Sequence, residues 1–245
     1  MPGSIFGLSN AALVGESPLA YALDALEPFV GGSHIAHLPY AQVRGDHDHR
    51  ALRGALGTIG ATTHTVTDPG QAAPAISRAD VVLVSGGNTF LLLRTLQSHR
   101  LTELIRGRVA NGMTYIGISA GTNVLSPTIA TTNSMPIVHI ASPHALGLLP
   151  FQLNVHLPTR APDPTHAGES RHERIREYVD LHQRPVLALH EGSWVQRTAD
   201  RLTVRGRGGA LFDRSGTRDL KDDTDLSALL HTSTPPPNTH KDHTC

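Results

Sequence analysis

The stretch YIGISAGTN, Tyr115 to Asn123, decides the fold because it joins an apolar strand to a helical segment through a turn of small residues. Gly117, Ala120 and Gly121 surround Ser119, and such small residues allow the backbone to turn sharply. In a turn of this kind the serine has strained dihedral angles, and its hydroxyl projects from the strand end. The stretch therefore predicts a nucleophile elbow with Ser119 as the candidate nucleophile.

Short apolar or β-branched runs alternate with amphipathic segments around this stretch, which is typical of a parallel sheet covered by helices. The predicted strands are Ser4 to Leu8, His34 to Pro39, Thr62 to Val66, Val81 to Val84 and Thr114 to Ile118. The predicted helices are Pro18 to Phe29, His47 to Leu56, Gly70 to Ser77, Thr89 to Leu96 and Leu101 to Ala110. We expect a doubly wound α/β fold with a mostly parallel sheet, helices on both faces, and ligands at the carboxyl ends of the strands.

The second half of the chain has a less regular pattern. It contains a Pro- and His-rich stretch at Ser142 to Pro164, a charged helix at Gly168 to His182, and short strands at Val186 to His190 and Ser193 to Arg197. From Asp222 onward the chain is polar and ends in TSTPPPNTHKDHTC, which has too few apolar residues to offset the entropy of ordering. The sequence predicts one α/β domain over residues 1–221, completed by the second half, and a disordered tail over residues 222–245.

Composition disfavours several classes of function. The 245 residues are 39% hydrophobic, enough for one sizeable core, and the 21 basic residues balance the 21 acidic ones. No net charge therefore favours nucleic acid or an anionic membrane as a partner. The single cysteine, Cys245, builds neither a disulfide framework nor a thiolate cluster. With no signal-peptide pattern and no run of about eighteen apolar residues, we expect a cytoplasmic protein.

The stretch VVLVSGGNTF, Val81 to Phe90, contains a second loop that follows an apolar strand. Its paired glycines let backbone amides approach a ligand, so the N–H of Gly87 is a candidate oxyanion donor. The N–H of Ala120, at the start of the helix after the elbow, is the other. Asn88 or Thr89 is also suited to cap the helix that follows. Neither loop reads G-x-G-x-x-G, which disfavours a dinucleotide site.

A serine hydroxyl needs a base to remove its proton and a third group to orient that base. His156, in QLNVHLP, and Glu191, in VLALHEGSW, each stand at the end of a short apolar run. Active sites of α/β folds collect at such strand ends. His190 is a rival base, and a lone histidine is more often structural. Ser119, His156 and Glu191 are therefore the candidate catalytic set.

Six motifs together resemble the peptidase E family, the aspartyl dipeptidases among the serine peptidases. They are GGNTF, YIGISAGTN, PTIATTNSMPIV at Pro127 to Val138, NVH at Asn154 to His156, GESRHERIREY at Gly168 to Tyr178, and HEGSW at His190 to Trp194. The match extends from LSN at Leu8 to Asn10 through Trp194. The resemblance implies a flavodoxin-like α/β fold on which a Ser-His-Glu triad removes N-terminal aspartate from dipeptides, with no metal or other cofactor.

Carried onto this chain, the resemblance implies that Ser119 is the nucleophile, His156 the general base and then acid, and Glu191 the carboxylate that orients the imidazole. It also implies a small acidic dipeptide as substrate and a chain that is monomeric or homodimeric. The order Ser, His, Glu differs from the Ser, acid, His order of α/β-hydrolases, and no HGGG-type loop is present. Both observations disfavour an ordinary α/β-hydrolase esterase.

The resemblance also implies substrate-binding residues. Arg171 is the candidate partner of the aspartyl carboxylate, because a guanidinium meets a carboxylate with two hydrogen bonds; as an alternative it is a surface charge of an amphipathic helix. His166 is a weaker candidate, and Asn88 is assigned to the same group. Ser134 stands where family members carry an acid, so it either contributes a hydroxyl hydrogen bond or alters recognition of the substrate amine.

Two other functions stay open. A cyanophycinase-like hydrolase of β-aspartyl peptides shares the serine elbow but needs a pocket for a branched polyamide, and the GESR and TTN motifs favour the dipeptidase. A degenerate member would bind acidic peptides without turnover, and its support is Ser134 together with Ala130, which stands where a basic residue is often present.

The cluster GDHDH, Gly45 to His49, carries residue types that bind divalent metals. No second set of ligands accompanies it. We favour Asp46 as a helix cap with exposed histidines beside it, and we predict no metal site.

Overall fold

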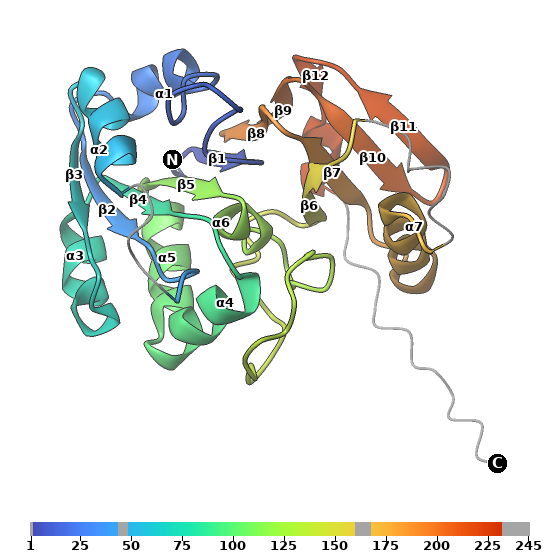
Figure 1. The fold of residues 1–245 in the computed structure, drawn as a ribbon, viewed down its shortest axis with the longest axis horizontal. Coiled ribbons are helices and arrows are strands. Elements are labelled where there is room, and N and C mark those ends of the chain that lie inside the picture. Colours follow the sequence, from blue (N-terminus) through green and yellow to red (C-terminus); the bar gives the residue numbers. More distant parts are fainter. Residues whose placement is uncertain (1, 44–48, 160–167, 232–245) are drawn as a thin grey trace.

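Five parallel strands form the centre of the computed structural model, which describes residues 2–43, 49–159 and 168–231 (Figure 1). They are β1 (Ile5–Leu8), β2 (His34–Leu38), β3 (Thr62–Thr65), β4 (Val81–Val84) and β5 (Thr114–Ile118). Their order in the sheet is β1-β5-β4-β2-β3, with every neighbouring pair parallel. All five predicted strands are thus confirmed to within one residue at each end.

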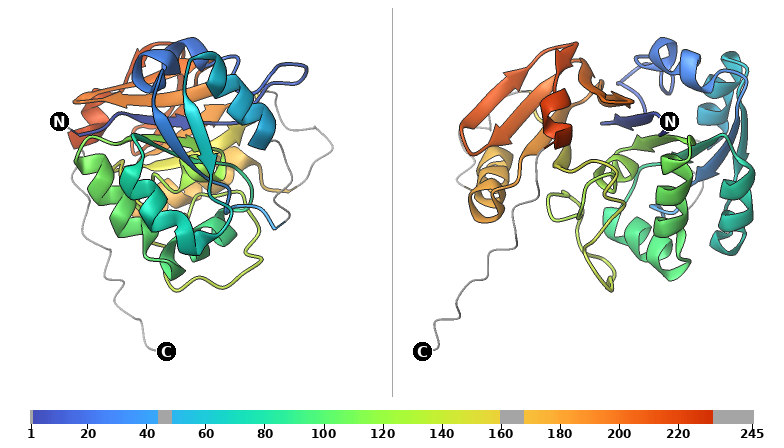
Figure 2. Two further views of the ribbon diagram at one scale, coloured as in Figure 1. Left: turned by 90° about the vertical axis from the view of Figure 1, so that its left-hand side faces the viewer. Right: turned by 180° about the vertical axis from the view of Figure 1, so that it is seen from behind.

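Helices cover both faces of this sheet, as predicted (Figure 2). They are α1 (Leu23–Val30), α2 (His49–Thr58), α3 (Ala72–Arg78), α4 (Thr89–Ser98) and α5 (Leu101–Ala110), with a 3₁₀ turn η1 (Pro69–Gln71) before α3. Buried side chains of α1 and α2 pack on one face and those of α3, α4 and α5 on the other. Helix α1 begins five residues later than predicted, because Leu19 has a positive φ of 62° that no right-handed helix accepts.

The strand order reverses between β2 and β4. From β2 the chain continues outward to β3, and it then crosses back to β4 and β5, on the side of β1. In doubly wound sheets such a switch point opens a crevice at the carboxyl ends of the strands, where ligands bind.

The second half of the chain extends the first sheet and also builds another one. Strands β8 (Ser193–Thr198), β9 (Arg201–Gly206) and β12 (Thr224–Asp225) continue the first sheet beyond β1 in antiparallel fashion. Strands β6 (Gln152–Leu157), β7 (Val186–His190), β10 (Gly209–Asp213) and β11 (Gly216–Leu220) form a separate sheet in the order β11-β10-β7-β6. The predicted strands at 186–190 and 193–197 are confirmed, but they belong to different sheets.

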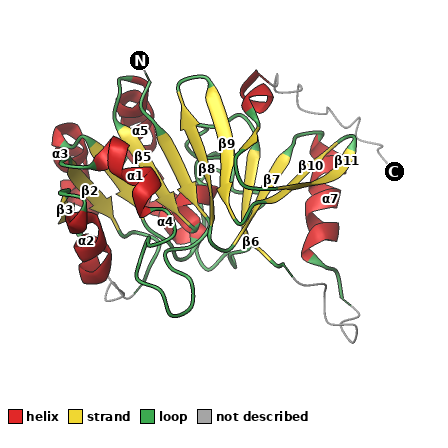
Figure 3. Cartoon of the chain, turned by 90° about the horizontal axis from the view of Figure 1, so that it is seen from above, coloured by secondary structure: helices red, strands yellow, loops and turns green. Residues whose placement is uncertain are grey.

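Helix α7 (Arg171–His182) packs on this second sheet, at the opposite end of the molecule from α2 and α3 (Figure 3). Its buried residues are Ile175 and Val179. The helix begins at Arg171 because Ser170 caps it: the hydroxyl accepts from the Glu173 N–H at 3.2 Å while the Glu173 carboxylate accepts from the Ser170 N–H at 2.6 Å.

The folded chain continues past the predicted boundary at residue 221. Strand β12 pairs with β9, and a 3₁₀ helix η2 (Ser227–His231) follows it. Leu226 and Leu229 are 3% and 9% exposed and belong to the main hydrophobic core. Their burial stabilises a segment whose other residues are mostly polar. The rest of the predicted tail, residues 232–245, lies outside the described residues. None of the described helices has the length and apolar character needed to cross a membrane.

Candidate active site

Ser119 occupies a strained turn between β5 and the short helix α6 (Ala120–Asn123). Its φ and ψ are 53° and −105°, a conformation that side-chain-bearing residues rarely adopt. Glycine is required on both sides. A Cβ at Gly117 would lie 2.5 Å from the Gly121 carbonyl oxygen, and one at Gly121 would lie 2.0 Å from the Val84 carbonyl oxygen. The predicted nucleophile elbow is therefore present in its geometry, and it leaves the Ser119 side chain at the end of β5.

The three candidate catalytic side chains form one line of hydrogen bonds. Ser119 Oγ lies 2.8 Å from His156 Nε2, and His156 Nδ1 lies 2.6 Å from Glu191 Oε1. Because the carboxylate faces Nδ1, that nitrogen carries the proton and Nε2 is free to accept from the serine hydroxyl. The His156 and Glu191 side chains are 38% and 47% exposed, so the site opens to solvent. The rival base His190 instead donates from Nδ1 to the Leu157 carbonyl at 3.0 Å.

His156 reaches Ser119 because strand β6 is irregular at this residue. The register between β6 and β7 shifts between Asn154 and Leu157, and His156 has a φ of 60°. The irregularity frees its peptide groups from the ladder. Ser9 Oγ accepts from the His156 N–H at 2.9 Å, while Arg171 Nη1 donates to the His156 carbonyl at 2.6 Å.

Ser9 and Asn10, at the end of β1, are functional candidates that the sequence analysis did not identify. Ser9 is fully buried and also donates from Oγ to the Leu189 carbonyl at 3.3 Å, which ties β1 to β7. Asn10 Oδ1 accepts from the Gly192 N–H at 2.8 Å, next to Glu191. Both belong to the LSN motif, but their partners are about 150 to 180 positions away along the chain, so no local pattern indicates these contacts.

Of the two predicted oxyanion donors, Ala120 is next to Ser119 in the chain, and Gly87 follows a glycine that packs against it. Ala120 begins α6 directly after Ser119, and a Cβ at Gly86 would lie 3.0 Å from Ser119 Cβ, which places the glycine loop against Ser119. Gly87 has a φ of 139°, and a Cβ there would lie 2.3 Å from the Ala41 carbonyl oxygen. Within the described residues, neither N–H is used in a turn or cap. A cavity of about 280 Å³ opens here, with Ser119, His156 and Gly86 in its wall.

Asn88 and Ser134 both cap helix α4. Asn88 Oδ1 accepts from the N–H groups of Phe90 and Leu91 at 3.0 and 3.1 Å, and Ser134 Oγ accepts from the Thr89 N–H at 3.0 Å. The alternative cap role foreseen for Asn88 is thus confirmed. A contact of either residue with substrate stays a prediction.

Arg171 contacts strand β6, which carries His156. Besides its bond to His156, its Nη1 donates to the Val155 carbonyl at 3.2 Å. Partial burial, with Arg174 nearby, lowers the pKa of the Arg171 guanidinium. Its predicted bond to a substrate carboxylate is untested by these contacts, and His166 lies outside the described residues.

The possible metal cluster at residues 45–49 also falls largely outside the described residues. Its last member, His49, begins α2. Within the described ranges, no group of three His, Cys, Asp or Glu side chains is arranged to hold a metal ion.

Comparison with known proteins gives consistent matches over most of the chain. The model of peptidase family S51 matches residues 5–205. A protein named peptidase E from Streptomyces coelicolor is 41% identical over 226 residues, covering 91% of this chain and 93% of that protein. The probable alpha-aspartyl dipeptidase of Drosophila melanogaster is 37% identical over 232 residues, covering 91% and 95%.

A solved structure supports the fold. The crystal structure of a putative peptidase E protein from Listeria monocytogenes EGD-e matches with a TM-score of 0.64 at 21% identity, covering 84% of this chain and 99% of that one. The family match spans β1 to β9 and so includes every element that carries Ser119, His156 and Glu191.

Proposed function

The chain belongs to peptidase family S51 and is a serine dipeptidase, and from this premise we propose that it removes N-terminal aspartate from Asp-Xaa dipeptides through an acyl-enzyme. The observation that carries the proposal is the line of hydrogen bonds from Ser119 through His156 to Glu191, with distances of 2.8 and 2.6 Å. The strained turn at Ser119 supports the same role for its hydroxyl.

In the acylation half-reaction, His156 Nε2 accepts the proton of the Ser119 hydroxyl as Oγ attacks the aspartyl carbonyl carbon. Glu191 stabilises the imidazolium that forms. The N–H groups of Gly87 and Ala120 donate to the oxyanion of the tetrahedral intermediate. His156 then gives its proton to the leaving nitrogen, the carbon–nitrogen bond breaks, and the C-terminal amino acid departs.

In the deacylation half-reaction, a water molecule takes the place of the leaving amine. His156 removes a proton from this water, which attacks the aspartyl ester. Collapse of the second tetrahedral intermediate returns the proton to Ser119 Oγ and releases free aspartate. The open side of the site, where His156 and Glu191 are 38% and 47% exposed, supports direct entry of water.

For selection of aspartate, we assign Arg171 to the substrate carboxylate. Its Nη1 is engaged by the carbonyls of Val155 and His156, which leaves the rest of the guanidinium for a ligand. Ser134 Oγ, which accepts from the Thr89 N–H, stands in place of a family acid beside the glycine loop. We assign it a hydrogen-bonding role near the substrate, without the charge that would attract an α-ammonium group.

The remaining expectations belong to the same proposal. The enzyme needs no cofactor and binds no nucleic acid. It is located in the cytoplasm and is a monomer or a homodimer. The aligned triad favours turnover over peptide binding without catalysis.

The experiment supplies Asp-Leu, Glu-Leu, Ala-Leu and N-acetyl-Asp-Leu to the purified protein and measures released leucine. We expect cleavage of Asp-Leu alone, and loss of at least about 10⁴-fold in kcat for Ser119→Ala. Equal cleavage of the acetylated peptide would contradict selection of an N-terminal aspartate and would mean a serine hydrolase with altered recognition of the substrate amine. Full activity of Ser119→Ala would contradict the mechanism.

A further inference from the structure

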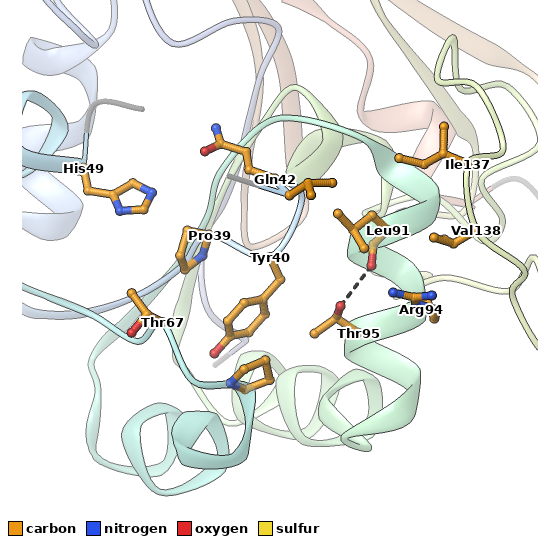
Figure 4. Close-up of a pocket in the computed structure, with 12 residues that line it drawn as sticks. Pro39, Tyr40, Gln42, His49, Thr67, Leu91, Arg94, Thr95, Ile137 and Val138 are labelled. Carbon is orange, nitrogen blue, oxygen red and sulfur yellow. Dashed lines mark hydrogen bonds between the residues drawn. The ribbon is translucent and has the colours of Figure 1, made fainter. Parts of the chain in front are cut away.

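A second cavity of about 700 Å³ adjoins the cavity that holds Ser119. Gln42 and His49 line both, so the two share a wall. The larger cavity lies past the carboxyl ends of β2, β3 and β4, with Tyr40, Thr67 and residues of α4 around it (Figure 4). This is the switch point of the sheet, where doubly wound proteins bind ligands.

Three of the side chains that line this cavity carry a buried polar atom without a partner among the described residues. Tyr40 Oη, Gln42 Oε1 and His49 Nε2 are buried and have no hydrogen-bond partner among the described residues, and Tyr40 is only 6% exposed. Buried polar atoms are normally paired, so these three side chains keep unused hydrogen-bonding capacity next to the cavity, which favours a polar ligand over a purely apolar one. Burial, with Asp68 nearby, raises the pKa of the Tyr40 hydroxyl, which therefore stays protonated and able to donate.

The cavity also combines a cation with an apolar wall. Arg94 stands on the same face of α4 as Leu91 and Thr95, and Ile137 and Val138 lie beyond it (Figure 4). Arg94 is exposed and forms no ion pair within the described part of the chain. None of the described side chains that line the cavity is a carboxylate. The nearby carboxylate of Asp68, between the lining residues Thr67 and Pro69, accepts from the Gly70 N–H at 2.9 Å, so Arg94 remains without a carboxylate partner among the described residues.

Resting on the proposed function, we propose that this cavity is the subsite for the leaving group, with Arg94 as the partner of its C-terminal carboxylate. The apolar side chain of the leaving residue packs against the wall formed by Leu91 and Ile137. Gly87, the assigned oxyanion donor, directly precedes the α4 cap. Arg94 lies six residues after that cap, or about 9 Å along the helix axis. An extended peptide spans about 3.5 Å per residue, so a leaving group of one or two residues covers part of this separation. The long side chain of Arg94 covers the rest, which lets its guanidinium meet the C-terminal carboxylate.

The test measures binding by calorimetry in the Ser119→Ala background, where peptides are not turned over. The ligands are Asp-Leu and Asp-Leu-Leu, each with a free C-terminal carboxylate and as the C-terminal amide. We expect the acid to bind about 5- to 10-fold more tightly than the amide for at least one length. Adding Arg94→Ala should bring this ratio close to one, and Arg94→Lys should keep part of it. Arg218→Ala, an exposed arginine on β11, is the matched control and should leave the ratio unchanged.

An acid-to-amide ratio that Arg94→Ala leaves unchanged at both lengths, or no binding of either form, overturns the inference. Hydrolysis by the wild-type chain is measured separately to distinguish this failure from failure of the proposed function. If the wild-type chain cleaves Asp-Leu but the acid-to-amide affinity ratio does not depend on Arg94, the proposed function stands and the subsite is refuted. A ratio that depends on Arg94 in a chain that cleaves no aspartyl peptide retains the subsite and removes the proposed function.

Discussion

Ser9→Ala tests whether the hydroxyl at the end of β1 positions the catalytic base. Ser9 Oγ accepts from the His156 N–H at 2.9 Å and is fully buried, so alanine leaves that N–H without a partner in the interior. An orphaned buried donor costs about 1–3 kcal/mol of unfolding free energy. We therefore expect a loss of about 2 kcal/mol in urea unfolding.

The same substitution should lower kcat while KM stays near its wild-type value, because Ser9 acts on His156 rather than on the substrate. A displacement of about 1 Å in a catalytic group costs on the order of 10²-fold in rate, so we expect kcat for Asp-Leu to fall by about 10- to 100-fold.

Ser126→Ala is the matched control. Ser126 is also fully buried, and its Oγ accepts from the Leu153 N–H of the same strand, also at 2.9 Å. Its partner Leu153 is still in regular register with β7 and precedes the irregular part of β6, so loss of this hydroxyl should lower stability by a similar amount and leave kcat unchanged. If both variants lower kcat equally, or neither does, Ser9 is a structural residue only and the positioning argument is wrong.

Three further predictions concern the turn, the triad and a buried histidine. Gly121→Ala places a Cβ 2.0 Å from a carbonyl oxygen of β4 and should cost about 3 kcal/mol in unfolding free energy, whereas Gly107→Ala, where a Cβ meets nothing within 4 Å, should be neutral or stabilising. Glu191→Gln should lower kcat by about 10³-fold because the imidazole loses its charged partner, and a loss below tenfold would exclude Glu191 as the orienting acid. Burial lowers the pKa of His37 from 6.5 to about 4, so the unfolded chain binds the extra proton between these values and stability should fall as pH drops through them. Urea unfolding at pH 7 and pH 4 should show up to about 3 kcal/mol of this loss, and His37→Gln should remove it.

Local patterns in the sequence were sufficient to predict the central sheet, and together with the family resemblance they singled out the three side chains that the fold brings into one line of hydrogen bonds. Each strand of the sheet is a short apolar or β-branched run before a turn, and Ser119, His156 and Glu191 follow such runs. Patterns of this kind do not indicate which sheet a strand joins. The sequence therefore does not show that β6 and β7 belong to one sheet and β8 to the other.

Other features that the sequence does not predict depend on particular residues or on contacts between distant parts of the chain. The start of α1 depends on the left-handed backbone of Leu19, and the order of the segment after residue 221 depends on two leucines that bury against distant strands. The contacts of Ser9 and Asn10 join opposite ends of the chain, and only the folded structure brings them together.

The line from Ser119 to Glu191 crosses from one sheet to the other. Ser119 stands at the end of β5, while His156 stands on β6 and Glu191 follows β7. Sub-global opening of a protein commonly involves units of this size and requires less free energy than complete unfolding. Parting of the two sheets would separate Ser119 from His156 while each sheet kept its own strands. The proposed catalytic activity thus depends on the two sheets staying packed together. During gradual denaturation, activity should be lost before the secondary structure is.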